Sequence, residues 1–274
     1  MKQELLIRRE AEKVAWESMR GFRAVMIHGP RQAGKSTLAQ ELARKHNLDY
    51  CTLDYEAELV AALADPPTFL AEKGTPLVLD EAQRGGEPLV RAIKAVVDRS
   101  NDRGQFLLTG STNFLTIPTI SESLAGRMDI IELWPLAAGE LLGGHNDFIE
   151  RAFNRPDALV GRRPSTLQRN EYFDLIAAGG FPEIQNASDS LRARWFARYT
   201  RTVIEREVEM QSDLIKTDAL DQLARFFAAN SAQELHIANA KSKLGLDPRT
   251  INSFIRWLQV TFLIHLVPSW SRNL

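Results

Sequence analysis

A glycine-rich loop near the amino terminus has the residue types and the spacing of a phosphate-binding site. The stretch from Gly29 to Thr37 satisfies the pattern G-x-x-x-x-G-K-[ST], with an apolar run before it and a helix-forming segment after it. The glycines allow backbone N–H groups to point at phosphate oxygens, and the start of the helix adds its positive dipole end. We predict that this loop binds ATP through Gly29, Pro30, Arg31, Gln32, Ala33, Gly34, Lys35, Ser36 and Thr37.

Two carboxylates follow a short apolar run, at the point where a buried strand would end. The run Leu-Val-Leu at 77–79 is followed by Asp80 and Glu81. With the glycine loop upstream, Lys35 would reach the β- and γ-phosphates, while Ser36 and Asp80 would hold Mg²⁺, Asp80 directly or through water. Glu81 would polarise the attacking water as general base. Without such a loop, the same carboxylates would be solvated residues at the start of a turn.

Small polar residues also follow a later apolar run, from Thr109 to Asn113. A hydroxyl or amide beside Asp80 could contact the γ-phosphate or orient the water, and so report hydrolysis to the backbone. Thr109, Ser111 and Asn113 are the candidates, and their spacing does not choose among them. An ST-turn would use the same residue types without touching a nucleotide.

One arginine, Arg127, is a candidate for a catalytic cation. Arg127 follows the segment Ser-Leu-Ala-Gly at 123–126 and precedes an apolar run. An arginine near a γ-phosphate stabilises charge in the transition state, in cis or from a neighbouring subunit. Arg127 therefore joins Glu81 and Lys35 as a catalytic candidate, with the role of a structural ion-pair partner as its alternative.

These residues need a sheet to bring them together, and the sequence alternates short apolar runs with helical segments. The predicted strands are Arg23–Ile27, Tyr50–Leu53, Leu77–Leu79, Gln105–Leu108 and Asp129–Leu133. The predicted helices are Gln3–Met19, Lys35–His46 and Glu87–Asp98. Strands separated by crossover helices imply an α/β fold, in which a parallel sheet is covered on both sides and ligands bind at the carboxyl ends of the strands.

The rest of the chain has a different texture. Residues 139–166 are rich in glycine, arginine and proline, which indicates an extended connection, and a helical region with a break at Gly179–Pro182 follows. Helices at Ala219–Ala229, Ala238–Leu244 and Arg249–Gln259, then a strand at Thr261–Val267, suggest a winged helix-turn-helix. We therefore predict an amino-terminal helix (1–20), a P-loop core (21–138), a basic linker with a helical region (139–212) and a winged-helix-like domain (213–274).

The last predicted helix could face DNA. Its outward positions carry Arg249, Asn252, Ser253 and Arg256, which suit phosphates and base edges. Only two of the four are basic, whereas nonspecific DNA affinity grows with the number of phosphate contacts. DNA therefore stays an open partner that is not favoured, and packing within the chain or against a protein partner is the preferred interpretation.

Composition sets broad limits on function. The 274 residues have a formal net charge of −1, which excludes a globally basic nucleic-acid coat but allows a local basic patch. The single cysteine, Cys51, cannot form an internal disulfide and is interpreted as a small buried hydrophobe. The charged segment Met1–Glu12 does not resemble a secretion signal, and no window is apolar enough to span a bilayer. We expect a soluble cytoplasmic protein without a membrane partner.

Taken together, the motifs GPRQAGKST, LDEAQR, LTGSTN and LAGR resemble those of prokaryotic AAA-type P-loop ATPases, and more narrowly of ATP-binding proteins that carry a C-terminal domain of unknown function. The segments Trp134–Leu136 and Gly179–Glu183 are similar to further landmarks of that group. So is Tyr199–Val208, where the group's usual Arg-Asp-Val is Arg206-Glu207-Val208. The resemblance implies an ATPase core of the additional-strand type, with Lys35, Ser36, Asp80 and Glu81 in the roles given above.

The resemblance also implies a longer protein. Members of this group usually continue well past the equivalent of Leu274, into a nuclease-like fold, so we expect either a truncated chain or a short member. No nuclease active site is discernible in the sequence.

We predict an enzyme that hydrolyses ATP with Mg²⁺ as a conformational switch or small motor, with a protein partner or a second copy of itself. The alternative is a non-hydrolysing, nucleotide-gated regulator that binds protein or DNA, in which Glu81 is idle. A phosphotransferase is disfavoured, because Asp80 and Glu81 suit the activation of water and no acceptor pocket is discernible.

Overall fold

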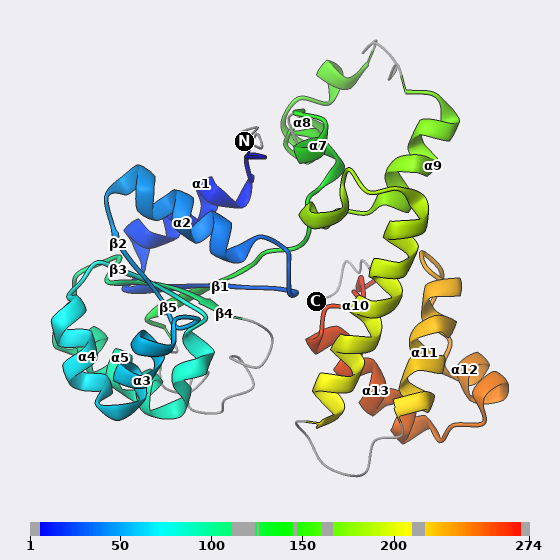
Figure 1. Cartoon of the computed structure of the whole chain (residues 1–274). Coiled ribbons are helices and arrows are strands. Elements are labelled where there is room, and N and C mark those ends of the chain that lie inside the picture. The colour runs from blue at the N-terminus through cyan, green and yellow to red at the C-terminus, as the bar shows by residue number, and fades with distance from the viewer. Residues whose placement is uncertain are drawn as a thin grey trace. The chain divides into compact units, whose positions relative to one another are not determined.

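The computed structural model describes residues 6–110, 124, 126–144, 147–160, 167–209 and 217–269. The chain forms two compact units, Met1–Asn186 and Ala187–Leu274. The first unit contains a parallel sheet, and the described part of the second is built from helices (Figure 1).

The sheet of the first unit has five parallel strands in the order β2-β3-β4-β1-β5. The strands are β1 Ala24–His28, β2 Asp49–Thr52, β3 Leu77–Asp80, β4 Phe106–Gly110 and β5 Met128–Glu132. Their ends lie within two residues of the predicted ones. Because all the strand pairs are parallel, the prediction of a parallel α/β sheet is confirmed. Because β4 lies between β1 and β3, the sheet has the strand order of the additional-strand type.

Helices cover both faces of this sheet (Figure 1). They are α1 Ala11–Gly21, α2 Lys35–His46, α3 Glu56–Ala64, α4 Pro66–Lys73, the 3₁₀ turn η1 Ala82–Gly85 and α5 Gly86–Arg99. Met26 and Leu108 pack with residues of α3, α4 and α5, whereas Ile27 and Leu107 pack with residues of α1 and α2. Since successive side chains of a strand point to opposite faces, a strand covered on both sides has no side chain that faces solvent. This is why β1 and β4 are buried along their whole length.

The helix at the amino terminus is shorter than predicted. It begins at Ala11, and residues 6–9 are not helical, so the prediction of a helix from Gln3 was wrong for these residues. The Arg9 side chain and the Glu10 N–H both bond to the carboxylate of Glu140, which is far away in sequence. These tertiary bonds hold the segment in a conformation that its charged, amphipathic pattern does not reveal.

Short helices follow the sheet in the first unit. They are α7 Ala138–Leu141, α8 Phe148–Asn154, the 3₁₀ turn η3 Pro156–Leu159, α9 Arg169–Ala178 and the 3₁₀ turn η4 Pro182–Ile184. The Leu136 N–H donates to the Gly180 carbonyl at 2.7 Å. A Cβ on Gly180 would lie 2.2 Å from the Leu136 oxygen, so only glycine permits this close approach. The break predicted at 179–182 thus brings two segments of the chain together.

The second unit has its own apolar core. Its helices are α10 Asp189–Glu209, α11 Thr217–Ala229, α12 Ile237–Leu244 and α13 Pro248–Val260. Ile251, Phe254, Ile255 and Leu258 of α13 are buried in this core, as predicted. Asp247 caps α13 through a hydrogen bond from the Arg249 N–H at 2.8 Å, with proline at the first helical position, which confirms the predicted start of this helix.

The strand predicted at Thr261–Val267 is absent, and that prediction was wrong. Helix α13 ends in a Schellman turn instead: Phe262 has a φ of 58°, and the Leu263 N–H donates to the Leu258 carbonyl at 2.8 Å. Leu263 and Ile264 then pack against the core from this turn. Without that strand, the described residues of the second unit give the three predicted helices α11, α12 and α13 but no wing.

None of the helices in the described part of the chain combines the length and the apolar character that crossing a bilayer requires.

Candidate functional site

The glycine loop joins the carboxyl end of β1 to the start of α2. A Cβ on Gly29 would lie 2.2 Å from the Leu133 carbonyl oxygen, because the Leu133 N–H donates to the His28 carbonyl at 2.7 Å and holds the two segments together. Gly34 has a φ of 94°, in the left-handed region that side chains disfavour. Glycine is therefore required at each position for a different physical reason: the close approach of the Leu133 backbone at Gly29, and the left-handed backbone conformation at Gly34.

Lys35 points into this loop. Its Nζ donates to the Gly29 carbonyl at 3.1 Å and to the Pro30 carbonyl at 2.8 Å, and the residue is only 5% exposed. Burial lowers the pKa of Lys35 to about 8, against the opposing carboxylate of Glu81 and, more weakly, that of Asp80. The Lys35 ammonium thus lies in the loop at a position that a bound phosphate would contact, and it interacts electrostatically with the carboxylates of Glu81 and Asp80.

The other loop residues line the same turn at different depths. Pro30 and Ala33 are buried, Ser36 is half-buried in the first turn of α2, and Arg31, Gln32 and Thr37 are exposed. Gln32 has a φ of 61°, which a side chain adopts only at a cost of about 1 to 2 kcal/mol. Such strain in a loop is often found where a ligand is bound.

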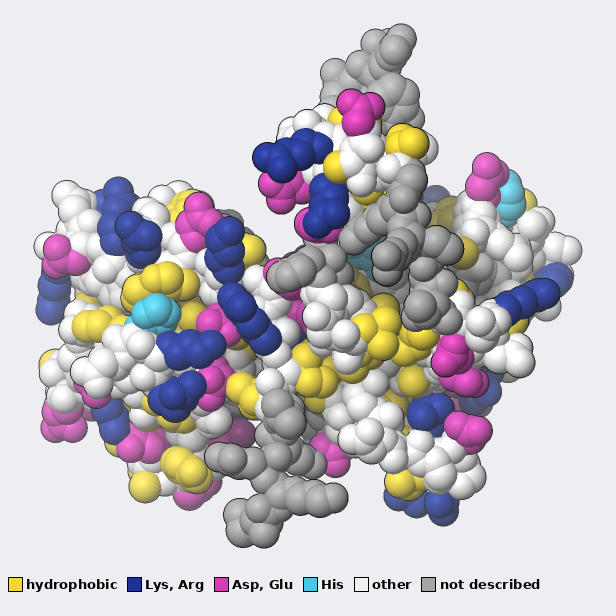
Figure 2. Space-filling model, turned by 90° about the horizontal axis from the view of Figure 1, so that it is seen from above, with side chains coloured by type: hydrophobic (Ala, Val, Ile, Leu, Met, Phe, Trp, Pro, Cys, Tyr) yellow, Lys and Arg dark blue, Asp and Glu magenta, His cyan; other side chains and the backbone are white. Residues whose placement is uncertain are grey.

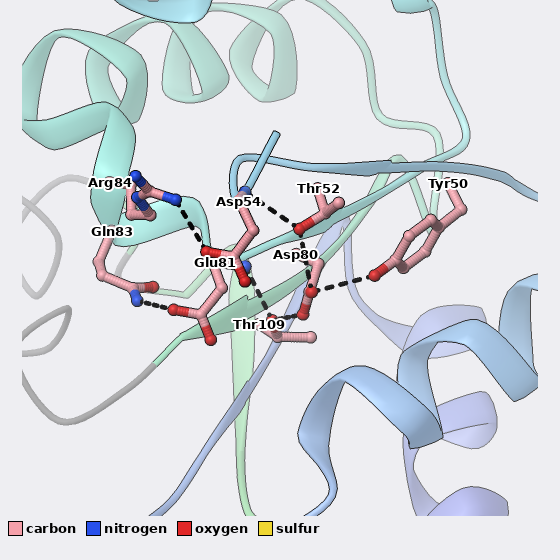
Figure 3. A network of polar contacts seen from close by, with 8 residues as sticks. All are labelled: Tyr50, Thr52, Asp54, Asp80, Glu81, Gln83, Arg84 and Thr109. Atoms are coloured by element: carbon pink, nitrogen blue, oxygen red, sulfur yellow. Dashed lines mark hydrogen bonds and ion pairs between the residues drawn. The ribbon is translucent and has the colours of Figure 1, made fainter. Parts of the chain in front are cut away.

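Asp80 ends β3 and is held by hydroxyl groups from both neighbouring strands (Figure 3). The Thr109 hydroxyl of β4 donates to Oδ1, while the hydroxyls of Tyr50 (3.0 Å) and Thr52 (3.2 Å) of β2 donate to Oδ2. An ionised carboxylate only accepts hydrogen bonds, at about four lone-pair positions, so three donors fix its orientation and leave little capacity free. This donor set suits a hard cation such as Mg²⁺ that keeps most of its water ligands.

Tyr50 and Thr52 were not predicted as site residues. The parallel register pairs Tyr50 with Val78 and Thr52 with Asp80, and this puts both hydroxyls beside the carboxylate. Burial raises the pKa of Tyr50 to about 12, so the phenol stays protonated and acts as a donor. Polar residues at alternate positions of the second strand were the available signal, but only the register shows which carboxylate they meet.

Glu81 follows Asp80 in a left-handed conformation, with a φ of 54°. Its N–H donates to the Thr109 hydroxyl at 3.1 Å, and its carboxylate accepts a hydrogen bond from the Gln83 side chain (Figure 3). The fully buried Thr109 therefore links the two acidic residues, since its hydroxyl accepts from Glu81 and donates to Asp80. Beside this group, Arg84 bonds to Asp54 at 2.8 Å.

A buried histidine lies next to the loop. His28 is 5% exposed, and its Nε2 lies 3.7 Å from a carboxylate oxygen of Glu132. Burial lowers the pKa of His28, and the ammonium of Lys35 lowers it further, while Glu132 opposes the shift. Near neutral pH this ring is neutral, so it adds no positive charge beside the buried ammonium of Lys35.

Arg127, another predicted residue, does not join this group. Arg127 precedes β5 at the amino edge of the sheet, where it forms an ion pair with Asp98 at 2.6 Å and its carbonyl accepts from the Ala24 N–H. The length of a strand, about 13 Å for four residue steps, separates that edge from the glycine loop. A catalytic role for Arg127 within its own chain does not fit this placement. Ser111 and Asn113 lie outside the described residues.

The strand order, the loop after β1 and the acidic end of β3 define a P-loop nucleotide-binding fold of the additional-strand class. In agreement, residues 21–142 match the family described as AAA domain, and residues 169–274 match a family described as a domain of unknown function. The first unit thus has a P-loop fold in which residues 21–142 are similar to an AAA domain, and residues 169–274 are similar to a domain of unknown function.

Individual relatives and a solved structure are similar to this chain over most of its length. Uncharacterized proteins of Mycobacterium tuberculosis and Mycobacterium bovis are each 35% identical over 272 residues, which cover 98% of this chain and 55% of the relative. The chain thus spans about half the length of these relatives. The structure of a Walker-type ATPase of Pyrococcus abyssi has a TM-score of 0.55 at 14% identity, covering 94% of this chain and 91% of that one. This likeness concerns the fold alone.

Proposed function

We propose that the chain binds ATP with Mg²⁺, hydrolyses it, and uses hydrolysis as a conformational switch. One observation carries the proposal: the Lys35 ammonium in the glycine loop lies in the field of Glu81 and Asp80, which are more than forty residues away in the sequence. With β4 between β1 and β3, the loop and the acidic strand end are two strand spacings apart, about 10 Å. That gap suits a γ-phosphate and an attacking water between cation and carboxylates.

The loop residues would hold the substrate. Lys35 would exchange its bonds to the Gly29 and Pro30 carbonyls for bonds to β- and γ-phosphate oxygens, with backbone N–H groups of the loop as further donors. Mg²⁺, held by the Ser36 hydroxyl and by Asp80 through water, would neutralise phosphate charge during the transfer. Tyr50, Thr52 and Thr109 would keep the Asp80 carboxylate in place, so that no reorganisation is needed during the reaction.

Glu81 would act as the general base. It would accept a proton from water as the water oxygen attacks the γ-phosphorus, and the bond to the β–γ bridging oxygen would break to release ADP and phosphate. In the structure one oxygen of the Glu81 carboxylate accepts a hydrogen bond from Gln83, and release of this bond would free the side chain to turn towards the attacking water. This exchange is the step that would make hydrolysis switchable.

The same contact favours one competing function. If Gln83 keeps the carboxylate of Glu81 when ATP is bound, the chain would be a nucleotide-gated regulator that binds ATP without hydrolysing it. Loss of phosphate release in Lys35→Ala, with no change in a Lys13→Ala control on the exposed face of α1, supports hydrolysis at the loop. Wild-type protein that binds Mg-ATP and releases no phosphate would support the gated regulator instead.

The partners of the switch form part of the proposal. We favour a protein or a second copy of the chain, in which Arg127 would serve a neighbouring active site. DNA is less favoured: Arg249, Asn252, Ser253 and Arg256 are all exposed on α13, but only two are basic. Figure 2 shows Lys and Arg side chains interspersed with Asp and Glu on the visible face of the first unit. Ion pairs of the first unit, such as Lys45–Glu12, neutralise part of its positive charge. Because the substrate is ATP, we place the protein in the cytoplasm.

A further inference from the structure

Arg9 is an arginine outside every motif, yet it bonds directly to the glycine loop. Its Nη1 donates to the Ala33 carbonyl at 2.8 Å and its Nη2 to the Trp134 carbonyl at 2.6 Å. The third nitrogen, Nε, donates to Glu140 at 3.1 Å. The side chain is only 10% exposed, so these bonds are made largely out of water. Every nitrogen of the guanidinium therefore has an acceptor, and the group is fixed in one orientation.

Glu140 holds this guanidinium through its Nε, the nitrogen that does not bond to a carbonyl. Its side chain is 6% exposed and accepts, besides Arg9, the N–H groups of Glu10 and Ala137, each at 2.8 Å. A buried carboxylate with three such donors is well satisfied, and its hydrogen bond from a guanidinium is charge-assisted. Arg9 is thus held by a carboxylate that lies outside the glycine loop.

The bond to Ala33 determines the direction of the next N–H group. In a trans peptide the carbonyl and the following N–H point to opposite sides, so the Gly34 N–H must point away from Arg9. A charge-assisted bond to the carbonyl also polarises the peptide and makes its N–H a stronger donor. A Cβ on Gly34 would lie 3.5 Å from Arg9 Nη1, so the guanidinium is in contact with this part of the loop.

We infer that Arg9 is a positioning residue of the phosphate site, which turns the Ala33–Gly34 peptide so that its N–H serves as a donor to the phosphates of a bound nucleotide. This inference rests on the proposed function, since it needs a nucleotide in the loop. Arg9 itself does not touch the phosphates. It acts through the peptide, while its bond to Trp134 ties the loop to the segment after β5.

The test measures Mg-ATP and Mg-ADP affinity together with the steady-state parameters of Arg9→Ala and Arg9→Lys. The neighbouring Arg8→Ala is the matched control, because Arg8 is exposed. Loss of one charge-assisted bond predicts affinity for both nucleotides about 10- to 100-fold weaker in Arg9→Ala. KM should rise while kcat changes little, because the N–H serves ground state and transition state alike. Millimolar guanidinium added to Arg9→Ala should restore part of the affinity, and Arg9→Lys should lie between wild type and Arg9→Ala.

Thermal unfolding of the nucleotide-free variants separates positioning from general stability. Arg9→Lys with weakened affinity but an unfolding temperature close to that of wild type supports the inference, and this variant decides if Arg9→Ala does not fold. Variants that bind both nucleotides like wild type, or that lose only thermal stability, would overturn it. Wild type and Arg8→Ala that bind neither nucleotide would overturn the proposed function, and the inference with it.

Discussion

The sheet edge of the first unit and the helical core of the second unit are specified in different ways. At the sheet edge, particular residues are required by close approach, backbone conformation and charge, as at Gly29, Gly34 and Asp80. In the second unit, residues such as Ile251 and Leu223 are required only to be apolar and of suitable size. A chemical role constrains the residue type at a single position, whereas packing constrains only the pattern of apolar residues along a helix. The sequence therefore informs about function at the sheet edge, and mainly about the presence of helices in the second unit.

The largest expected effect is on the free energy of unfolding, and it compares a glycine of the first unit, Gly29, with a glycine of the second, Gly245. Gly29→Ala would bring a Cβ to 2.2 Å from a backbone oxygen that cannot move without breaking the bond between Leu133 and His28. We expect a loss of unfolding free energy of about 3 kcal/mol or more, as for overpacking in a core. Gly245→Ala meets no atom within 4 Å and pays only for a φ of 66°, about 1 kcal/mol. Denaturant unfolding measures both, and equal losses would contradict the contrast.

The next effect concerns pH. Nucleotide binding requires protonated Lys35, whose pKa is about 8 in the free protein because of its burial. A bound triphosphate raises that pKa, so affinity should be constant below pH 8 and fall above it, by about tenfold between pH 7 and pH 9. Calorimetric titrations across this range measure the change. Lys35→Arg, which does not titrate here, should flatten the profile, and an equally steep profile in that variant would assign the titration to another group.

The smallest effect tests the hydroxyl groups around Asp80. Tyr50→Phe removes one donor to the carboxylate and leaves two, so we expect a loss of about 1 kcal/mol, or a few-fold in kcat/KM. Tyr55→Phe is the control, because Tyr55 is 69% exposed at the start of α3. Steady-state phosphate release compares the variants, and identical losses in both would show that the bond to Asp80 is unimportant.

The elements that could be predicted from the sequence are those with a clear local pattern of apolar residues or glycines. Strands β1, β3 and β4 were recovered because they are buried along their length and largely apolar, and the helix from Lys35 to His46 because it follows a glycine loop. Strands β2 and β5 are partly exposed and were recovered from their short apolar runs. Helices α3 and α4 were missed, since α3 buries only Ala62 and therefore has no apolar stripe to recognise. The strand at Thr261–Val267 failed for the opposite reason: its residues favour a strand, but packing of Leu263 and Ile264 after a Schellman turn overrides that preference.

The site shows the same limit. Lys35, Asp80 and Glu81 were predicted from the sequence because their spacing relative to strands is a local signal. Tyr50 and Thr52 depend on the register between β2 and β3, and Arg9 depends on contacts over 24 to 131 residues. No local pattern encodes such contacts. The residues that would react can thus be read from the sequence, whereas those that hold them in place become visible only in the structure.

The central claim is that Glu81 activates water at this site, and single-turnover phosphate release from bound Mg-ATP tests it most directly. Glu81→Gln keeps the size of the side chain but removes the base, so the rate should fall about 10²- to 10⁴-fold while ATP affinity stays near that of wild type. Glu56→Gln, on the exposed surface of α3, should match wild type in both measurements. Phosphate release by Glu81→Gln at the wild-type rate would contradict the account.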